Sequence, residues 1–222
     1  MRLGSGIALA SGYRVAVRQA LSRSSSTSGS DAGFSLVEMV VVLMIVAVGS
    51  MLAVPMIGNL LSAERIGGNA QALSNSTAMT KMRAAARFGA ARIRIDLAAR
   101  TYRAEIWRKT GTPGWETEGP VEQLSPGVSF GFQSIAAAPP NTQGTIGQAA
   151  ACRDDAGANI AGTACVVFNS RGLPIDSTGG PTGAGAFYIT DNAEVFAVTV
   201  SATGLVRTWR ARPTGTLNWV LQ

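Results

Sequence analysis

The hydrophobic and polar positions divide the chain into stretches with different periods. Residues 1–33 are polar and basic, and they include the low-complexity run SRSSSTSGSD. From Leu36 to Ile57 the sequence is apolar, and Glu38 is the single charged residue. A helix of these 22 residues would be about 33 Å long, enough to cross a bilayer core of about 30 Å. The pattern predicts a polar leader followed by a membrane-length helix.

The apolar residues beyond Pro55 continue at helical spacing. Pro55 removes a backbone donor and should kink the helix. Gly67 and Gly68 weaken the helix further on and would allow a local break there. We expect this amphipathic half to pack under a β-sheet through Leu60, Leu61, Ile66, Ala70, Leu73, Ala78, Met82 and Ala86.

After Gly89 the hydrophobic period changes to two, which is typical of strands. Residues 134–164 are rich in Ala, Gly, Pro and Asn and predict a long loop. The expected fold class is α+β, with a long N-terminal helix packed on an antiparallel β-sheet or β-sandwich head. The expected parts are a leader (1–33), the helix (34–88, with a membrane or filament core at 34–57) and a β-rich head (89–222). The candidate strands are 91–98, 102–109, 127–133, 165–170, 185–191, 195–201 and 204–211.

The distribution of charged residues predicts how the chain is oriented across a membrane. The net charge is +6 over 222 residues, and four arginines and one aspartate give residues 1–33 a net charge of +3. No Lys or Arg follows the apolar segment until Arg65. By the positive-inside rule the N-terminus stays in the cytoplasm and the head is exported. An exported head would allow Cys152 and Cys165 to form a disulfide that closes a loop of about 14 residues; without export the two would remain buried thiols.

A carboxylate inside an apolar helix needs an explanation, because it is costly in lipid unless it has a partner. The stretch GFSLVEMVVVLMIVAVGSMLAVP resembles the N-terminus of type IV pilins and type II secretion pseudopilins. In that comparison Gly33 precedes the processing site, Phe34 is the new N-terminus, and Glu38 is the acid at the fifth position. Pro55 stands where many family members have a helix-bending proline. The leader lacks the Lys or Arg often found just before the cut.

The resemblance implies processing and assembly. A prepilin peptidase would cut between Gly33 and Phe34 and N-methylate Phe34. Glu38 would pair with the N-terminal amine of a neighbouring subunit, which offsets part of the cost of burying both charges. The implied partners are other pilins or pseudopilins, the peptidase, the inner membrane and secreted cargo. The implied location is a single-pass inner-membrane protein with a periplasmic head.

The head narrows the resemblance to GspH/FimT-type minor pseudopilins and minor pilins, through strand–turn–strand patterns at Gly172 and Gly204. This implies a minor pseudopilin of a type II secretion system, at or near the tip of a periplasmic pseudopilus. The alternative is a FimT-like minor pilin of a type IV pilus that binds DNA for natural transformation. Such binding would use a basic tail in which three arginines surround an aromatic residue. These candidate residues are Arg207, Arg210, Arg212 and Trp209.

The sequence favours a protein without catalytic chemistry. No histidine is present, which excludes Ser-His-Asp and Cys-His arrangements. Asp154, Asp155 and Asn159 match no calcium-loop spacing, and we interpret them as solvated loop residues. We therefore expect no enzyme activity, no metal and no cofactor.

Overall fold

The computed structural model describes residues 33–213 and 218–222, and the side chains of residues 52–62 are not described. Apart from Gly33, the predicted leader lies outside the described residues, as does the side chain of Pro55. Helix α1 runs from Leu36 to Ala86. The chain divides into two compact units between Ala47 and Val48, within this helix.

Helix α1 is continuous through Pro55 and through Gly67–Gly68, so the sequence-based break does not occur at the two glycines. Ile66 and Ala70 on either side of the glycines are buried, and this packing outweighs the low helix propensity of glycine. Two residues after the end of the helix, Phe88 has a left-handed backbone conformation with a φ of 48°. The Gly89 N–H then donates to the Ala84 carbonyl over 3.1 Å and closes the last turn.

The strands form two five-stranded antiparallel sheets, which we call sheet A (order β3-β2-β1-β5-β6) and sheet B (order β10-β9-β8-β7-β4). The expected α+β class is thus confirmed. Sheet A comprises β1 Ala91–Asp96, β2 Thr101–Arg108, β3 Gly114–Gln123, β5 Thr163–Phe168 and β6 Pro174–Ile175. Sheet B comprises β4 Ser129–Phe130, β7 Gly185–Thr190, β8 Val195–Val200, β9 Val206–Ala211 and β10 Val220–Leu221.

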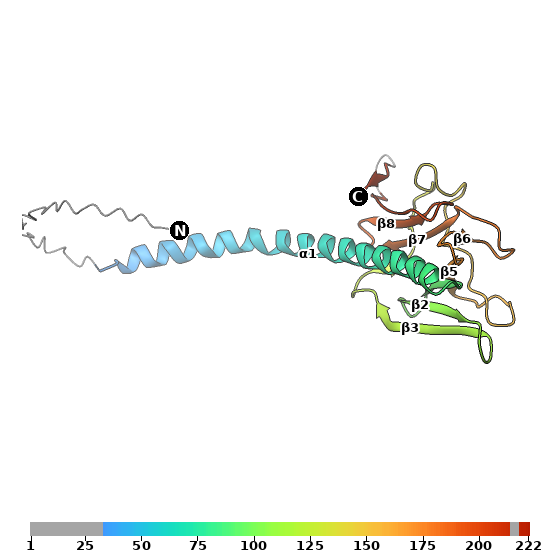
Figure 1. Cartoon of the computed structure of the whole chain (residues 1–222). Coiled ribbons are helices and arrows are strands. Elements are labelled where there is room, and N and C mark those ends of the chain that lie inside the picture. The colour runs from blue at the N-terminus through green and yellow to red at the C-terminus, as the bar shows by residue number, and fades with distance from the viewer. Residues whose placement is uncertain (1–32, 214–217) are drawn as a thin grey trace, which may run out of the picture. The chain divides into compact units, whose positions relative to one another are not determined.

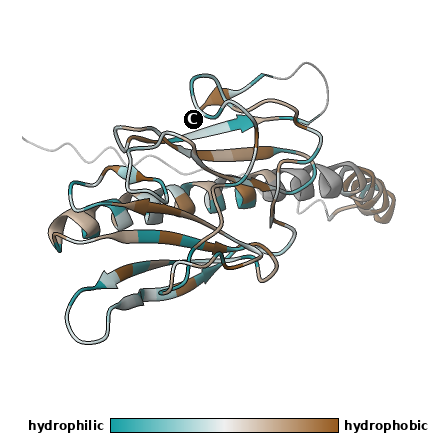
Figure 2. Ribbon diagram, turned by 90° about the vertical axis from the view of Figure 1, so that its right-hand side faces the viewer, coloured by the Kyte–Doolittle hydropathy of each residue, from teal (hydrophilic) through white to brown (hydrophobic). Residues whose placement is uncertain are grey.

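The C-terminal half of α1 lies across both sheets, with β2 and β3 on one side and β7 and β8 on the other (Figure 1). Ile66 and Leu73 of the helix share one core with Ile93 of sheet A and Phe187 of sheet B. The hydrophobic central strands and the more polar β3 can be followed in Figure 2. The expected packing of the helix under a sheet is correct for Ile66, Ala70 and Leu73, and both sheets take part. It is wrong for Met82 and Ala86, which are exposed. In this part of the helix the buried face instead carries Thr77, Thr80 and Ala84.

The turns at Gly172 and Gly204 meet beside the helix. Both glycines have positive φ, 73° and 76°, a conformation that strains other residues. A Cβ placed on Gly204 would lie 2.5 Å from the Gly172 carbonyl oxygen. The Lys81 ammonium of α1 donates to the Gly204 carbonyl over 2.9 Å. Lys81 therefore ties the helix to the Gly204 turn of sheet B, and that turn lies against the Gly172 turn of sheet A.

Candidate functional site

The predicted processing residues lie at the N-terminal end of α1 and are exposed to solvent. Gly33 and Phe34 precede the first helical residue, and Phe34 is 77% exposed. An added Cβ on Gly33 would meet nothing within 4 Å. The Ser35 carbonyl accepts the first helical hydrogen bond, from the Met39 N–H. The backbone between Gly33 and Phe34 is thus outside the helix, where a peptidase could bind it as an extended chain.

Glu38 lies in the first turn of α1 and is exposed. An acidic side chain there is favoured by the helix dipole, because the unpaired N–H groups of the first turn carry partial positive charge. Sequence reasoning attributed this acid to intersubunit pairing alone and missed the local contribution. The motif places the carboxylate where both effects can act.

The apolar side chains of the first helical turns are exposed. All described side chains from Leu36 to Met51 are exposed, and the large ones include Leu36 at 80% and Met51 at 82%. A continuous apolar surface of this kind on a monomer marks a site of contact with protein or lipid. Among the described residues, no helix has a stretch that is both long and apolar enough to cross a membrane.

Comparison with known families gives one match. Residues 29–54 match the family model of the prokaryotic N-terminal methylation motif. The match includes Gly33, Phe34 and Glu38 and stops just before Pro55. No curated protein and no solved structure matches the chain.

The matched motif is the signal of type IV pilin-like prepilins, so the chain carries a type IV pilin-like N-terminus. Such a motif is consistent with membrane anchoring and with assembly into a pilus-like filament with other pilins. The match ends within the helix and does not reach the head. The more specific assignment to the GspH/FimT group therefore rests on the sequence pattern of the head.

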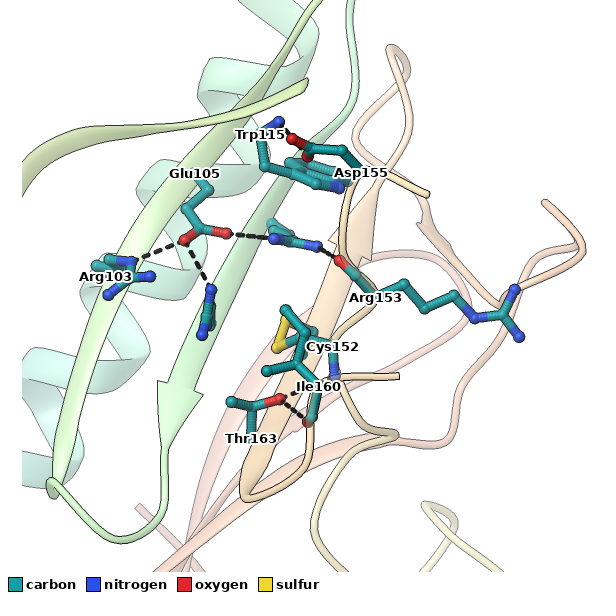
Figure 3. Close-up of polar contacts among 11 residues, drawn as sticks. Arg103, Glu105, Trp115, Cys152, Arg153, Asp155, Ile160 and Thr163 are labelled. Atoms are coloured by element: carbon teal, nitrogen blue, oxygen red, sulfur yellow. Dashed lines mark hydrogen bonds and ion pairs between the residues drawn. A yellow bond between two sulfur atoms is a disulfide. The ribbon is translucent and has the colours of Figure 1, made fainter. Parts of the chain in front are cut away.

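Residues 149–155 form a strap that ties the two sheets together. The Ala149 N–H donates to Ala186 of β7, and the Cys165 N–H of β5 donates to the Ala150 carbonyl. Cys152 and Cys165 form the disulfide expected for an exported head. Further along the strap, the Asp155 carboxylate accepts the Trp115 N–H of β3 over 2.9 Å (Figure 3). Asp155 is thus engaged in holding the strap to the edge strand of sheet A.

Beneath the strap, buried charges converge on Glu105 of β2. Arg92 contacts its carboxylate at 2.6 Å and Arg103 at 2.7 Å, while Arg94 lies 3.6 Å away. Burial alone would raise the pKa of Glu105, but hydrogen bonds and charge from Arg103 and Arg92 hold it below its ordinary value. The Arg92 guanidinium also lies 3.9 Å from the centre of the Trp115 ring. Glu105 is therefore ionised over the whole neutral range.

A cavity of about 420 Å³ adjoins the strap, and Arg92, Trp115, the disulfide, Ile175 and Asp176 help to line it. Two of its charged lining residues are already engaged with other groups. Arg92 pairs with Glu105, and one Asp176 oxygen accepts hydrogen bonds from the backbone of Thr178 and Gly180. Within the described residues, no three His, Cys, Asp or Glu side chains are grouped so as to hold a metal ion.

The basic tail residues are separated by the strand that carries them. Arg207 and Trp209 lie on one face of β9 and Arg210 on the other, because side chains alternate along a strand. Trp209 is 8% exposed and donates its indole N–H to Thr199, so its ring is not presented for base stacking. The DNA-binding hypothesis grouped the four residues by their closeness in the sequence, and β9 does not keep them on one face.

Glu194 engages the two arginines at the end of β9. Arg210 forms a double hydrogen bond with its carboxylate, and Arg212 approaches within 3.3 Å. Burial would raise the pKa of Glu194, but the hydrogen bonds and charges of these two arginines hold it below its ordinary value. Among the described residues, no carboxylate lies within 4 Å of Arg207. The tail's surplus positive charge is thus smaller than three arginines suggest.

Proposed function

We propose that the chain is a minor pseudopilin of a type II secretion system. It is a non-enzymatic structural subunit at or near the tip of a periplasmic pseudopilus. In this account the leader is removed after Gly33, and residues 34–57 insert in the inner membrane before assembly. The match of residues 29–54 to the methylation motif carries the proposal. The GspH/FimT pattern of the head, with its turns at Gly172 and Gly204, supports a minor rather than a major subunit.

The exposed surface of α1 supports a role in assembly. The apolar side chains between Leu36 and Met51 need a non-aqueous environment, since burial contributes about 25 cal/mol per Å² of apolar surface. Lipid would cover them before assembly, and the helices of neighbouring subunits would cover them afterwards. The same surface then serves both as membrane anchor and as filament core.

Glu38 gives this surface a preferred register. Cleavage after Gly33 would leave a positively charged amine on Phe34, four residues before the acid. In the filament, Glu38 of one subunit would face the amine of another, and the paired charges cost less to bury than either charge alone. A carboxylate among lipid-facing side chains therefore favours the assembled state over the isolated subunit.

The proposal is tested by Glu38→Gln in a host that contains the assembly machinery. We expect normal membrane insertion but loss of cross-linking to neighbouring pseudopilins, measured in membrane and sheared fractions. The matched control is Glu64→Gln, which removes an exposed acid from the same helix and should cross-link as the wild type does. Unchanged cross-linking of the Glu38→Gln protein would contradict the proposed role.

The alternative function, DNA capture by a FimT-like minor pilin, has one observation in its favour: Arg207 and Arg212 are exposed. The pairing of Arg210 and Arg212 with Glu194 and the burial of Trp209 favour the structural role instead. A gel shift of duplex DNA by the full chain in nonionic detergent distinguishes the two. Salt-dependent retardation that a triple Arg207→Ala, Arg210→Ala, Arg212→Ala variant abolishes would support DNA capture; no retardation at low salt would exclude it.

A further inference from the structure

The outer face of sheet A, the face turned away from α1, carries surplus positive charge. Ile93 and Ile95 of β1 point into the core, so the alternate residues Arg92 and Arg94 point outward. Glu105 of β2 pairs with Arg92 in the strand register and lies on the same face. Arg103, two residues earlier, joins them there. Three guanidinium groups thus share the Glu105 carboxylate. Asp155, whose charge acts on Arg92, is a second acid near them, so positive charge still exceeds negative charge in this cluster.

The strand register increases the repulsion within the cluster. Arg94 stands directly opposite Arg103 in the pairing of β1 with β2. Like charges at directly opposite positions destabilise a sheet. Glu105 relieves this only in part, because its carboxylate also holds Arg92 at 2.6 Å. A second anion beside Arg94 and Arg103 would remove the remaining repulsion.

The hydrogen-bond donors of the three arginines are not equally used. Arg92 is 2% exposed, and besides Glu105 it donates to the carbonyl of Arg153. Arg103 donates through Nε to Glu105 (Figure 3). The Nε of Arg94 is buried and has no hydrogen-bond partner within the described part of the chain. Buried donors are rarely left unpaired, so such a group points to an unseen water or ion.

Arg94 and Arg103 can still be reached from outside. Their side chains are 20% and 28% exposed, whereas that of Glu105 is 4% exposed. The acid nearest in sequence on this face, Asp96, accepts the N–H groups of Ala98 and Ala99. No ion pair joins it to Arg94 among the described residues. The two arginines therefore have spare donors, partial burial and an opening to solvent.

We propose that Arg94 and Arg103 form a binding site for an oxyanion, a carboxylate or phosphate group supplied from outside the chain. A guanidinium presents its N–H donors as a planar fork that fits the paired oxygens of such groups. Partial burial strengthens the attraction relative to bulk water. This site is on the head and does not depend on cleavage or filament assembly.

The test is an NMR titration of the full chain in nonionic detergent, with the arginine Nε–Hε signals as the readout. Sodium phosphate and sodium acetate are added separately, and sodium chloride keeps the ionic strength constant. We expect the Arg94 and Arg103 signals to shift and to saturate. Tighter binding of phosphate would identify a phosphate group as the ligand, and tighter binding of acetate a carboxylate.

Variants separate the site from general charge effects. Arg103→Gln should weaken binding about tenfold or more, since it removes a charged hydrogen-bond donor. Arg103→Lys keeps the positive charge and is the more conservative substitution. It should also weaken anion binding, because the planar fork of the guanidinium is lost. Arg171→Gln, at an exposed turn, is the matched control and should bind as the wild type does. Shifts that do not saturate, or that saturate equally in Arg103→Gln, would overturn the proposal.

Discussion

Phe88 has a left-handed backbone conformation, which is unfavourable for a residue with a bulky side chain. It lies at φ 48° and is 77% exposed, so it bears the cost of a left-handed backbone and gains little from burial. Glycine has no such cost at the end of a helix. We predict that Phe88→Gly raises the free energy of unfolding by about 0.5–1 kcal/mol, measured by urea denaturation. A loss of stability would contradict this prediction, because it would show that contacts of the Phe88 ring stabilise the fold by more than the left-handed conformation costs.

Glu105 is the residue on which the buried charges of sheet A depend. Its substitution by Gln leaves three arginines without their acid, and we predict a loss of about 3 kcal/mol in unfolding free energy. The pH dependence should change too. The folded pKa lies below the ordinary value of 4.5, so this stabilisation is present above that value and is lost as pH falls through the lower, folded pKa. Glu105→Gln should therefore lose less stability on acidification than the wild type.

The control for this prediction is Glu116→Gln. Glu116 forms an ion pair of 3.8 Å with Arg108, and its side chain is 57% exposed. Exposed pairs contribute about 0–1 kcal/mol, so this variant should differ little from the wild type. Two outcomes would contradict the prediction: an equal loss of unfolding free energy in the two variants, or a Glu105→Gln protein whose stability falls with acid as that of the wild type does. Either would show that burial does not determine how much the Glu105 ion pairs stabilise the fold.

Among the elements, the turns at Gly172 and Gly204 set how the two sheets meet the helix. Gly204→Ala would add a Cβ 2.5 Å from a backbone oxygen, at a position with φ 76°. We predict a loss of about 2 kcal/mol or more, measured by thermal or urea unfolding, since both the contact and the backbone conformation are unfavourable. The neighbouring Thr203→Ala is the comparison: its exposed side chain shares one hydrogen bond with the Ser201 hydroxyl, so the loss should be about 1 kcal/mol or less. Wild-type stability of Gly204→Ala would contradict this close packing.

Elements with a clear hydrophobic period could be predicted from the sequence, and elements without one could not. The alternation of Ile93 and Ile95 with Arg92 and Arg94 predicted β1 correctly. Strand β3 was missed because it is mostly polar and contains Gly119 and Pro120, which normally argue against a strand. It is an edge strand, and its pairing with β2 shifts register between Tyr102 and Ala104. The two-residue strand β10 carries too little pattern to be recognised, whereas β6 was anticipated as the strand that follows the Gly172 turn.

The candidate sites show the same limit. The disulfide followed from two cysteines and an expected export, and the processing residues followed from a motif that the family comparison also finds. The arginine cluster around Glu105 depends on strand register, which brings β1 and β2 together in one arrangement only. The partners of Arg210 and Arg212 depend on Glu194, a residue of the turn before β8. Contacts of this kind join segments that are far apart in the sequence, so no short sequence pattern predicts them.

The whole chain combines an exposed apolar helix segment with a β-rich head that has its own core. The described side chains from Leu36 to Met51 are exposed, whereas Ile66 and Leu73 pack in a core that both sheets share. The head should therefore keep its fold while the first half of the helix exchanges lipid for neighbouring subunits. This division of roles is what a subunit that leaves a membrane to join a filament requires.

The central claim is that the chain is processed as a prepilin, and the mass of its N-terminus tests this most directly. The protein is isolated from the cell in which it naturally occurs, digested, and its first peptide is sequenced by mass spectrometry. We predict that the mature chain begins at Phe34 and that its amine is methylated. A mature chain that still begins upstream of Phe34, with the leader attached, would contradict it.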